Sequence, residues 1–171
     1  MEIDTNEINL DFLHCCFATG HYEEAHDHAK KIVEELKRNN SIPTVFAHRI
    51  GYAHWMVGEK EEAKYYFDLQ KKIGLESIEK GRVITTRMVA YYDLAAVYAF
   101  EGDKDKAYKY LEELYEKKVF AAWWVHFINK DPLFDNIRNE SRFQAVAKHI
   151  EEGYQAEHER VGKWLAEQGM L

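Results

Sequence analysis

The sequence predicts an all-α protein, built as a solenoid of helical hairpins that pack one after another. Three observations indicate this fold class. Apolar residues recur at helical spacing along the chain, its 171 residues include only 2 Pro and 9 Gly, and one short turn motif occurs three times. A hydrophobic fraction of 46% with 31% charged residues is typical of a folded globular chain. The length corresponds to one domain, and we expect a single domain over residues 1–171.

The repeated turn motif is a glycine followed by polar residues and then an alanine. It occurs at Gly20–Ala25, Gly58–Ala63 and Gly102–Ala107, and we call the three glycines the hinge glycines. An apolar helical pattern precedes each glycine and another follows each alanine. This order is typical of a tight turn between two antiparallel helices. We therefore predict three hairpins, at about 5–38, 43–74 and 82–118.

Positions counted from the hinge glycines also match between the three copies. The matching positions lie seven before the glycine, four before it and nine after it. They hold Leu13, Gly51 and Ala95, then Cys16, His54 and Tyr98, then Ala29, Phe67 and Leu111. Small residues at a helix crossing let two backbones approach, and larger ones fill the space beside them. These positions therefore predict the contacts between the two helices of each hairpin.

The offsets resemble the tetratricopeptide repeat, with residues 91–107 as the best copy. The resemblance implies a right-handed α-α superhelix, a tetratricopeptide-like solenoid, and a role in protein–protein interaction. The hinge spacings of 38 and 44 residues exceed the repeat's about 34, and no proline closes a second helix. We expect longer second helices or loops to take up the excess. Generic helical hairpins of no particular family are the alternative.

The third hairpin is followed by a degenerate helix and a cap, at about 119–150. Asp131 followed by Pro132 is a helix-start signal. Aspartate is a favoured N-cap, and the first helical residue has no partner within the helix for an N–H, so proline fits there. The string that follows resembles the closing element of tetratricopeptide arrays in bacterial signalling proteins. The resemblance implies C-terminal capping helices that cover the last hydrophobic face, and a bacterial signalling or regulatory context.

The C-terminal extension, residues 151–171, continues the helical spacing of the cap through Tyr154, Val161 and Leu165. We expect one helix from about Ser141 to Glu167. Such a helix is longer than the array requires. Three arrangements stay open: it folds back along the repeats, it pairs with a second copy as a homodimer through 151–171, or it frays.

Stacked hairpins present their first helices on a concave face, and the residues predicted there are mainly aromatic. The predicted partner-binding groove comprises His14, Phe17, His48, Arg49, Tyr52, Trp55, Tyr92 and Phe100. Aromatic rows of this kind suit a peptide or a partner helix. The alternative is that these rings fill the inside of a tightly curved superhelix. Trp123 and Trp124 diverge on a helix, so we expect one in the core and the other as a binding hot spot.

Charge and cysteine usage exclude several partners. The formal net charge of −7 makes nucleic acid an unsuitable ligand, and no apolar run is long enough to span a membrane. The two cysteines are the adjacent pair Cys15 and Cys16, which rarely form a bridge. Together with the absence of a signal-peptide pattern, they favour a reducing cytoplasm.

Metal and catalytic chemistry find little support in the residue spacing. Six zinc-type donors fall in one hairpin, namely His14, Cys15, Cys16, His21, His26 and His28. Neighbours in this set point in different directions on a helix, and no nucleophile elbow or phosphate loop occurs. We expect no metal, no cofactor and no catalytic residue. The sequence therefore predicts a non-catalytic interaction or scaffold module, with a peptide or small-molecule sensor and a homodimerisation module as alternatives.

Overall fold

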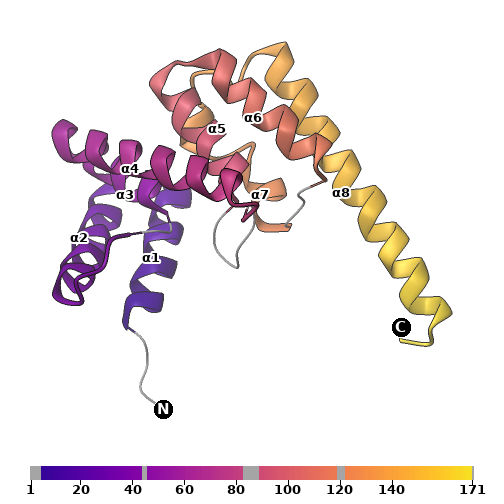
Figure 1. Ribbon diagram of the computed structural model, residues 1–171, viewed down its shortest axis with the longest axis horizontal. Helices are drawn as coiled ribbons and strands as arrows, with labels where there is room; N and C mark the ends of the chain where they lie inside the picture. Colours follow the sequence, from indigo (N-terminus) through magenta and orange to yellow (C-terminus); the bar gives the residue numbers. More distant parts are fainter. Residues whose placement is uncertain (1–4, 44–45, 83–88, 119–121, 171) are drawn as a thin grey trace. The chain divides into compact units, whose positions relative to one another are not determined.

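The fold was analysed in a computed structural model, which describes residues 5–43, 46–82, 89–118 and 122–170, without the side chains of 5–8 and 123. The elements in these segments are helical, which confirms the all-α prediction (Figure 1). They are α1 (Thr5–Thr19), α2 (Tyr22–Arg38), α3 (Ala47–Met56), α4 (Lys60–Glu79), α5 (Ala90–Glu101), α6 (Lys104–Glu116), α7 (Ala122–Phe127), the 3₁₀ helix η1 (Pro132–Phe134) and α8 (Ser141–Glu167). None of the helices in the described segments combines the length and the apolarity needed to cross a membrane.

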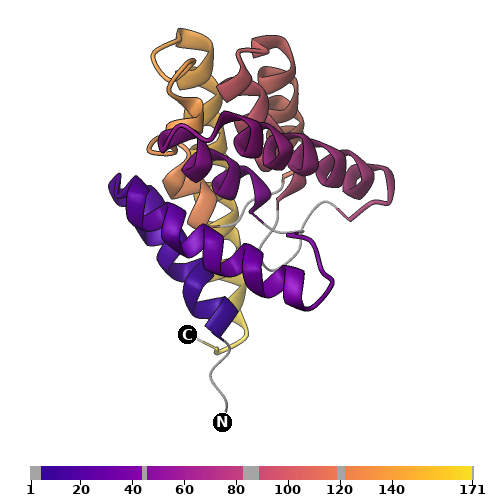
Figure 2. The same ribbon diagram turned by 90° about the vertical axis from the view of Figure 1, so that its left-hand side faces the viewer.

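The chain divides into two compact units, residues 1–97 and 98–171, with the boundary inside α5. In the first unit α1 packs against α2, both contact α3, and α3 packs against α4 (Figures 1 and 2). In the second unit α6 and α7 both pack against α8. α4 ends at Glu79, beyond the 43–74 expected for the second hairpin. α4 has 20 residues against 13 in α6, so a longer second helix takes up part of the excess spacing.

The three hinges share one backbone conformation, which Gly81 and Gly169 also adopt at the ends of α4 and α8. The hinge glycines have φ values of +78°, +91° and +84°, in the left-handed region that favours glycine. The residue after each glycine donates its N–H to the carbonyl five residues earlier, at 2.9, 3.0 and 2.9 Å. This is the Schellman motif, which satisfies the free carbonyls at a helix end. The same residue is the N-cap of the next helix, so a single glycine separates the caps of the two helices.

The positions matched by counting from the hinges lie in the core. Ala25, Ala63 and Ala107, five residues after each glycine, are fully buried. At Gly51, a Cβ atom would lie 3.0 Å from the carbonyl oxygen of Ala63 in α4. Real Cβ atoms rarely come so close, and the glycine therefore sets how closely α3 and α4 approach. The expected role of small residues at these crossings is confirmed here.

The cap begins where the sequence predicts it. The Asp131 carboxylate accepts a hydrogen bond from the N–H of Leu133 at 3.0 Å, and Pro132 is the first residue of η1. Arg138 fastens the segment, because its guanidinium donates to the carbonyl of Asp131 at 2.6 Å and also to that of Asn129. Behind it Phe134 packs 5.5 Å from Phe143 at the start of α8, with both rings fully buried.

α8 has the bounds expected from its apolar spacing. Its residues up to Ile150 and its later part, from residue 151 onward, differ in burial. Phe143, Ala147 and Ile150 are buried, whereas no residue from 151 to 170 is buried in the structure described. Within the second unit, Tyr154 contacts His126 of α7 with ring centroids 5.7 Å apart, and the rest of this later part extends away from α6 and α7 (Figure 1). A helix of 27 residues spans about 40 Å, so more than half of α8 lies beyond the last core residue.

Candidate functional site

The residues predicted to line a concave groove are mostly part of the core. Phe17, His48, Arg49, Tyr52 and Tyr92 are between 0% and 7% exposed. The Phe17 and Tyr52 rings meet edge to face at 5.1 Å, and the Arg49 guanidinium carbon lies 4.8 Å from the Phe17 ring centroid. The expectation of an open aromatic groove therefore needs correction at these five positions. For Phe17, Arg49 and Tyr52 the physical reason is that α1 and α3 pack together, so the Phe17 ring covers the other two side chains.

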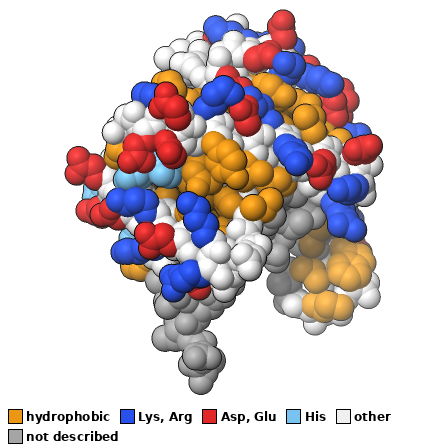
Figure 3. All heavy atoms as spheres, turned by 60° about the vertical axis from the view of Figure 1, so that its left-hand side comes forward, with side chains coloured by type: hydrophobic (Ala, Val, Ile, Leu, Met, Phe, Trp, Pro, Cys, Tyr) orange, Lys and Arg blue, Asp and Glu red, His pale blue; other side chains and the backbone are white. Residues whose placement is uncertain are grey.

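The remaining groove residues are more accessible. His14 is half-buried with its ring 4.1 Å from that of Phe46, and Phe100 is half-buried in the second unit. Trp55 is 39% exposed, and the Lys60 ammonium lies 3.5 Å from its ring centroid. Figure 3 shows hydrophobic side chains beside histidines on the face turned forward, with charged side chains around them. Trp55, Met56 and Val57 give exposed apolar surface just before the second hinge, and Phe12, Ile42, Tyr65 and Leu75 are also exposed on the first unit.

The two adjacent tryptophans were expected to divide between core and surface. Trp124 is fully buried and is among the largest buried side chains of the described chain. Its burial assigns it to the core and makes it unsuitable as an exposed hot spot. The side chain of Trp123 lies outside the described residues.

A buried polar group occupies the inside of the first unit. The Gln70 carbonyl oxygen accepts hydrogen bonds from Nδ1 of His48 at 3.0 Å and from its backbone N–H at 3.3 Å. The Gln70 amide donates to Asp93 at 3.4 Å. Nε2 of His48 lies 3.8 Å from the other Asp93 oxygen, close enough for an ion pair. Burial and the neighbouring Arg49 cation nevertheless hold the pKa of His48 well below 6.5, so we assign a neutral ring.

The depressed pKa of His48 predicts that acid destabilises the protein. Below about pH 6.5 the unfolded chain binds a proton at this residue, while the folded chain does not. The free energy of unfolding should therefore fall as the pH drops below 6.5, by up to about 1.4 kcal/mol per pH unit from this group. Urea denaturation at pH 7.5, 6.5 and 5.5 would measure this change in the free energy of unfolding. The variant His48→Gln should lose less stability over this range than the unmodified protein, and an equal loss would contradict the assignment.

Three potential metal-ligating side chains meet near the second hinge. Nε2 of His26 lies 3.0 Å from Oε2 of Glu59, and Nδ1 of His54 lies 2.5 Å from the same oxygen. His26 comes from α2, His54 from the end of α3, and Glu59 is the N-cap of α4. The two histidines are 7% and 6% exposed, while the Glu59 side chain is 45% exposed. The hydrogen bonds from the two histidines hold the pKa of Glu59 below its ordinary value.

The ring packing holds this group in place. The His54 ring stacks on Tyr66 at 5.4 Å, and the His26 ring meets His54 edge to face at 4.8 Å. One potential ligand atom from each of the three side chains lies within 4.8 Å of the others. Two imidazoles and a carboxylate are a donor set that zinc uses in proteins. We call this group the hinge cluster.

The donors singled out within the first hairpin do not come together as one group. Cys15 is exposed, and the thiol of buried Cys16 lies 3.9 Å from Glu24. His28 is held by Asn9 at 2.9 Å and stacks on the ring of Phe12. Only His26 of that set belongs to the hinge cluster. Spacing within one hairpin does not predict that His54 and Glu59 lie beside His26, because they stand at hinge positions of the second hairpin.

No known protein family, curated protein or solved structure matches this chain. Its function is therefore inferred from its own residues and their geometry.

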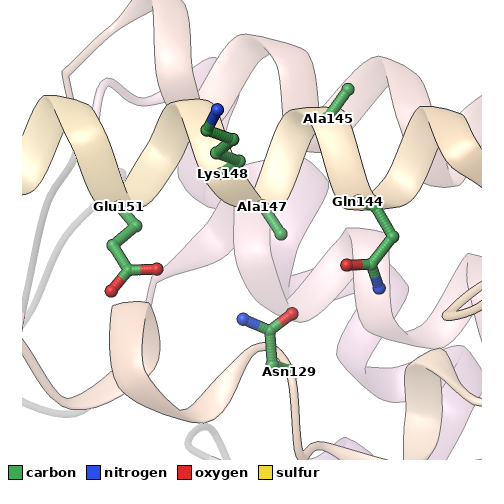
Figure 4. Close-up of a pocket in the computed structure, with 6 residues that line it drawn as sticks. All are labelled: Asn129, Gln144, Ala145, Ala147, Lys148 and Glu151. Carbon is green, nitrogen blue, oxygen red and sulfur yellow. The ribbon is translucent and has the colours of Figure 1, made fainter.

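A shallow hollow lies between α8 and the segment after α7. In Figure 4, Gln144, Ala147 and Glu151 point from α8 towards Asn129, whereas Lys148 points away. All these side chains except Ala147 are exposed, and none is a buried polar group aimed into the hollow. The surface is wide and polar, unlike the apolar, enclosed sites that bind small molecules.

Proposed function

We propose that the chain is a non-catalytic, tetratricopeptide-like scaffold that binds protein through the later part of α8. The right-handed superhelical arrangement, the bacterial signalling context and the cytoplasmic location belong to this proposal. The three hinges each combine a left-handed glycine with an N-cap at the next residue, which supports the repeat architecture. Two free cysteines in the described chain are consistent with a reducing compartment.

The observation that carries the proposal is an exposed apolar row on α8. Tyr154 and Leu165 are partly buried, and Val161 and Trp164 are 38% and 50% exposed. No described residue from 151 to 170 is buried. Most of the stability of a helix in a protein comes from packing an apolar face, and the later part of α8 packs little of its surface within the described chain. The row is therefore expected to be covered when the protein performs its function.

A second copy of the chain is the partner that the row fits best. Tyr154, His158, Val161 and Leu165 are separated by four, three and four residues, a spacing that reads the same in both directions. Two antiparallel copies can therefore place Tyr154 opposite Leu165 and His158 opposite Val161, with the same patch used on both sides. The contact is short, so we expect a dimer that dissociates on dilution.

The oligomeric state of the full chain tests this function. Sedimentation over a range of concentrations should show monomer and dimer in exchange. Leu165→Asp places a charge in the row and should leave the monomer at all concentrations. Ala156→Asp places the same charge on an exposed position of the same helix, outside the row, and should dimerise like the unmodified chain.

Two results would contradict the proposal. One is a full chain that stays monomeric at the highest concentration. The other is a Leu165→Asp variant that dimerises as well as Ala156→Asp does. Circular dichroism of both variants shows whether α8 keeps its helicity, which separates a lost interface from a lost helix.

A further inference from the structure

We propose that the hinge cluster, His26, His54 and Glu59, binds one divalent transition-metal ion of the zinc type. The ion would join α2 of the first hairpin to the turn between α3 and α4 of the second. This inference rests on the geometry of the first unit and is independent of the α8 dimer.

The ligand atoms are close to the arrangement that zinc requires. Zinc binds imidazole nitrogen at about 2.0–2.1 Å and carboxylate oxygen at about 2.0–2.2 Å, so tetrahedral ligands stand about 3.3 Å apart. The two nitrogen-to-oxygen distances are now 3.0 and 2.5 Å. To admit an ion the carboxylate has to retreat by about 0.3–0.8 Å, and the two nitrogens, which lie within 4.8 Å of each other, have to stand about 3.3 Å apart. Glu59 has room for this movement because its side chain is 45% exposed.

The two imidazoles are held beside each other by the packing of the first unit. Both are nearly buried, they contact each other edge to face, and Tyr66 stacks beneath His54. Prior positioning of the ligands reduces the entropy lost on binding. Nε2 of His54 is buried without a hydrogen-bond partner among the described residues. Nε2 has no hydrogen-bond partner in the metal-free state, when Nδ1 carries the proton, and none when Nδ1 binds an ion. Burying it therefore costs free energy in both states and does not oppose metal binding.

The proton balance also permits binding. In the metal-free cluster Nε2 of His26 and Nδ1 of His54 carry the protons that Glu59 accepts. When an ion takes these two nitrogens, each proton moves through solvent to the other nitrogen of its ring. Imidazole nitrogens without a proton and an ionised carboxylate then supply the ligands.

The donor set selects the class of ion. Magnesium and calcium prefer oxygen ligands and have little affinity for a site with two imidazoles. Zinc, copper and nickel accept imidazole together with carboxylate. The exposure of Glu59 leaves a fourth position open to water. We assign the ion a structural role because it would connect elements of two hairpins.

Zinc titration of the metal-free full chain tests this site. Calorimetry with zinc chloride should give one ion per chain, and saturating zinc should raise Tm by at least about 5 °C, reversed by a chelator. Magnesium chloride should change neither readout. Glu59→Gln and His26→Gln should each weaken zinc binding at least tenfold, while His21→Gln, an exposed histidine beside the first hinge, should bind like the unmodified chain.

Cobalt reports the ligands directly. The chain loaded with cobalt should show the visible bands of nitrogen and oxygen ligands and no thiolate charge-transfer band. The proposal is overturned if zinc binding is not saturable at one per chain, if Glu59→Gln and His26→Gln bind as tightly as His21→Gln, or if a thiolate band appears. Circular dichroism of the metal-free variants separates a lost ligand from a lost fold.

Discussion

Replacing Phe17 with alanine is expected to lower the free energy of unfolding by about 3–5 kcal/mol. The ring is 1% exposed, packs edge to face against Tyr52 and lies beneath the Arg49 guanidinium. Its removal would leave a cavity in the first unit and a buried cation without its aromatic contact. Urea denaturation followed by circular dichroism would measure the loss.

Phe12→Ala is the matched control, because Phe12 lies on the same helix and is 52% exposed. It stacks on His28 and is largely open to solvent, so its loss should cost about 1 kcal/mol or less. If Phe17→Ala costs no more than Phe12→Ala, the ring is not a core residue. The open-groove interpretation of the sequence would then be restored.

Trp124→Ala should also cost about 3–5 kcal/mol, with the effect centred on the second unit. Trp124 is fully buried, and no other fully buried side chain in the described chain is larger. Trp164→Ala provides the comparison, since this ring is 50% exposed on α8. It should change stability by less than about 1 kcal/mol and weaken dimer formation instead.

Thermal unfolding and sedimentation of the two tryptophan variants would separate these roles. A Trp124→Ala protein that is as stable as the unmodified chain but fails to associate would identify Trp124 as a binding residue. That result would contradict the assignment of Trp124 to the core.

The hinges could be predicted at the level of single residues because their chemistry is local. A glycine in the left-handed region, the carbonyls of the preceding turn and the N-cap that follows all lie within a few residues. The start of the cap at Asp131 and Pro132 follows for the same reason, and so do the bounds of α8. In each case the residues that decide the structure are neighbours in sequence.

The groove could not be predicted in this way, because it depends on packing between hairpins. Helical spacing places Phe17 and Tyr52 on the inner faces of first helices but does not say how closely those helices approach. With Gly51 at the crossing of α3 and α4, and α1 packed against α3, the faces close on each other. Exposed rings and core rings have the same sequence pattern.

The hinge cluster was missed for a related reason. His26 and His54 stand 28 residues apart, and no spacing within one hairpin brings them together. A usable signal existed in the repeat register, because His54 lies four residues before a hinge glycine and Glu59 one after it. Stacked hairpins bring hinge positions of neighbouring copies close together, so donors should be sought between copies.

Cysteine cross-linking of α8 tests the proposed function most directly. With Cys15 and Cys16 replaced by serine and alanine, the double variant Tyr154→Cys, Leu165→Cys should form a disulfide-linked dimer under mild oxidation. Tyr154→Cys alone should not, because an antiparallel pair separates the two copies of residue 154 by about 16 Å. A double variant that stays monomeric would contradict the self-association of α8. Cross-linking by Tyr154→Cys alone would contradict the antiparallel register.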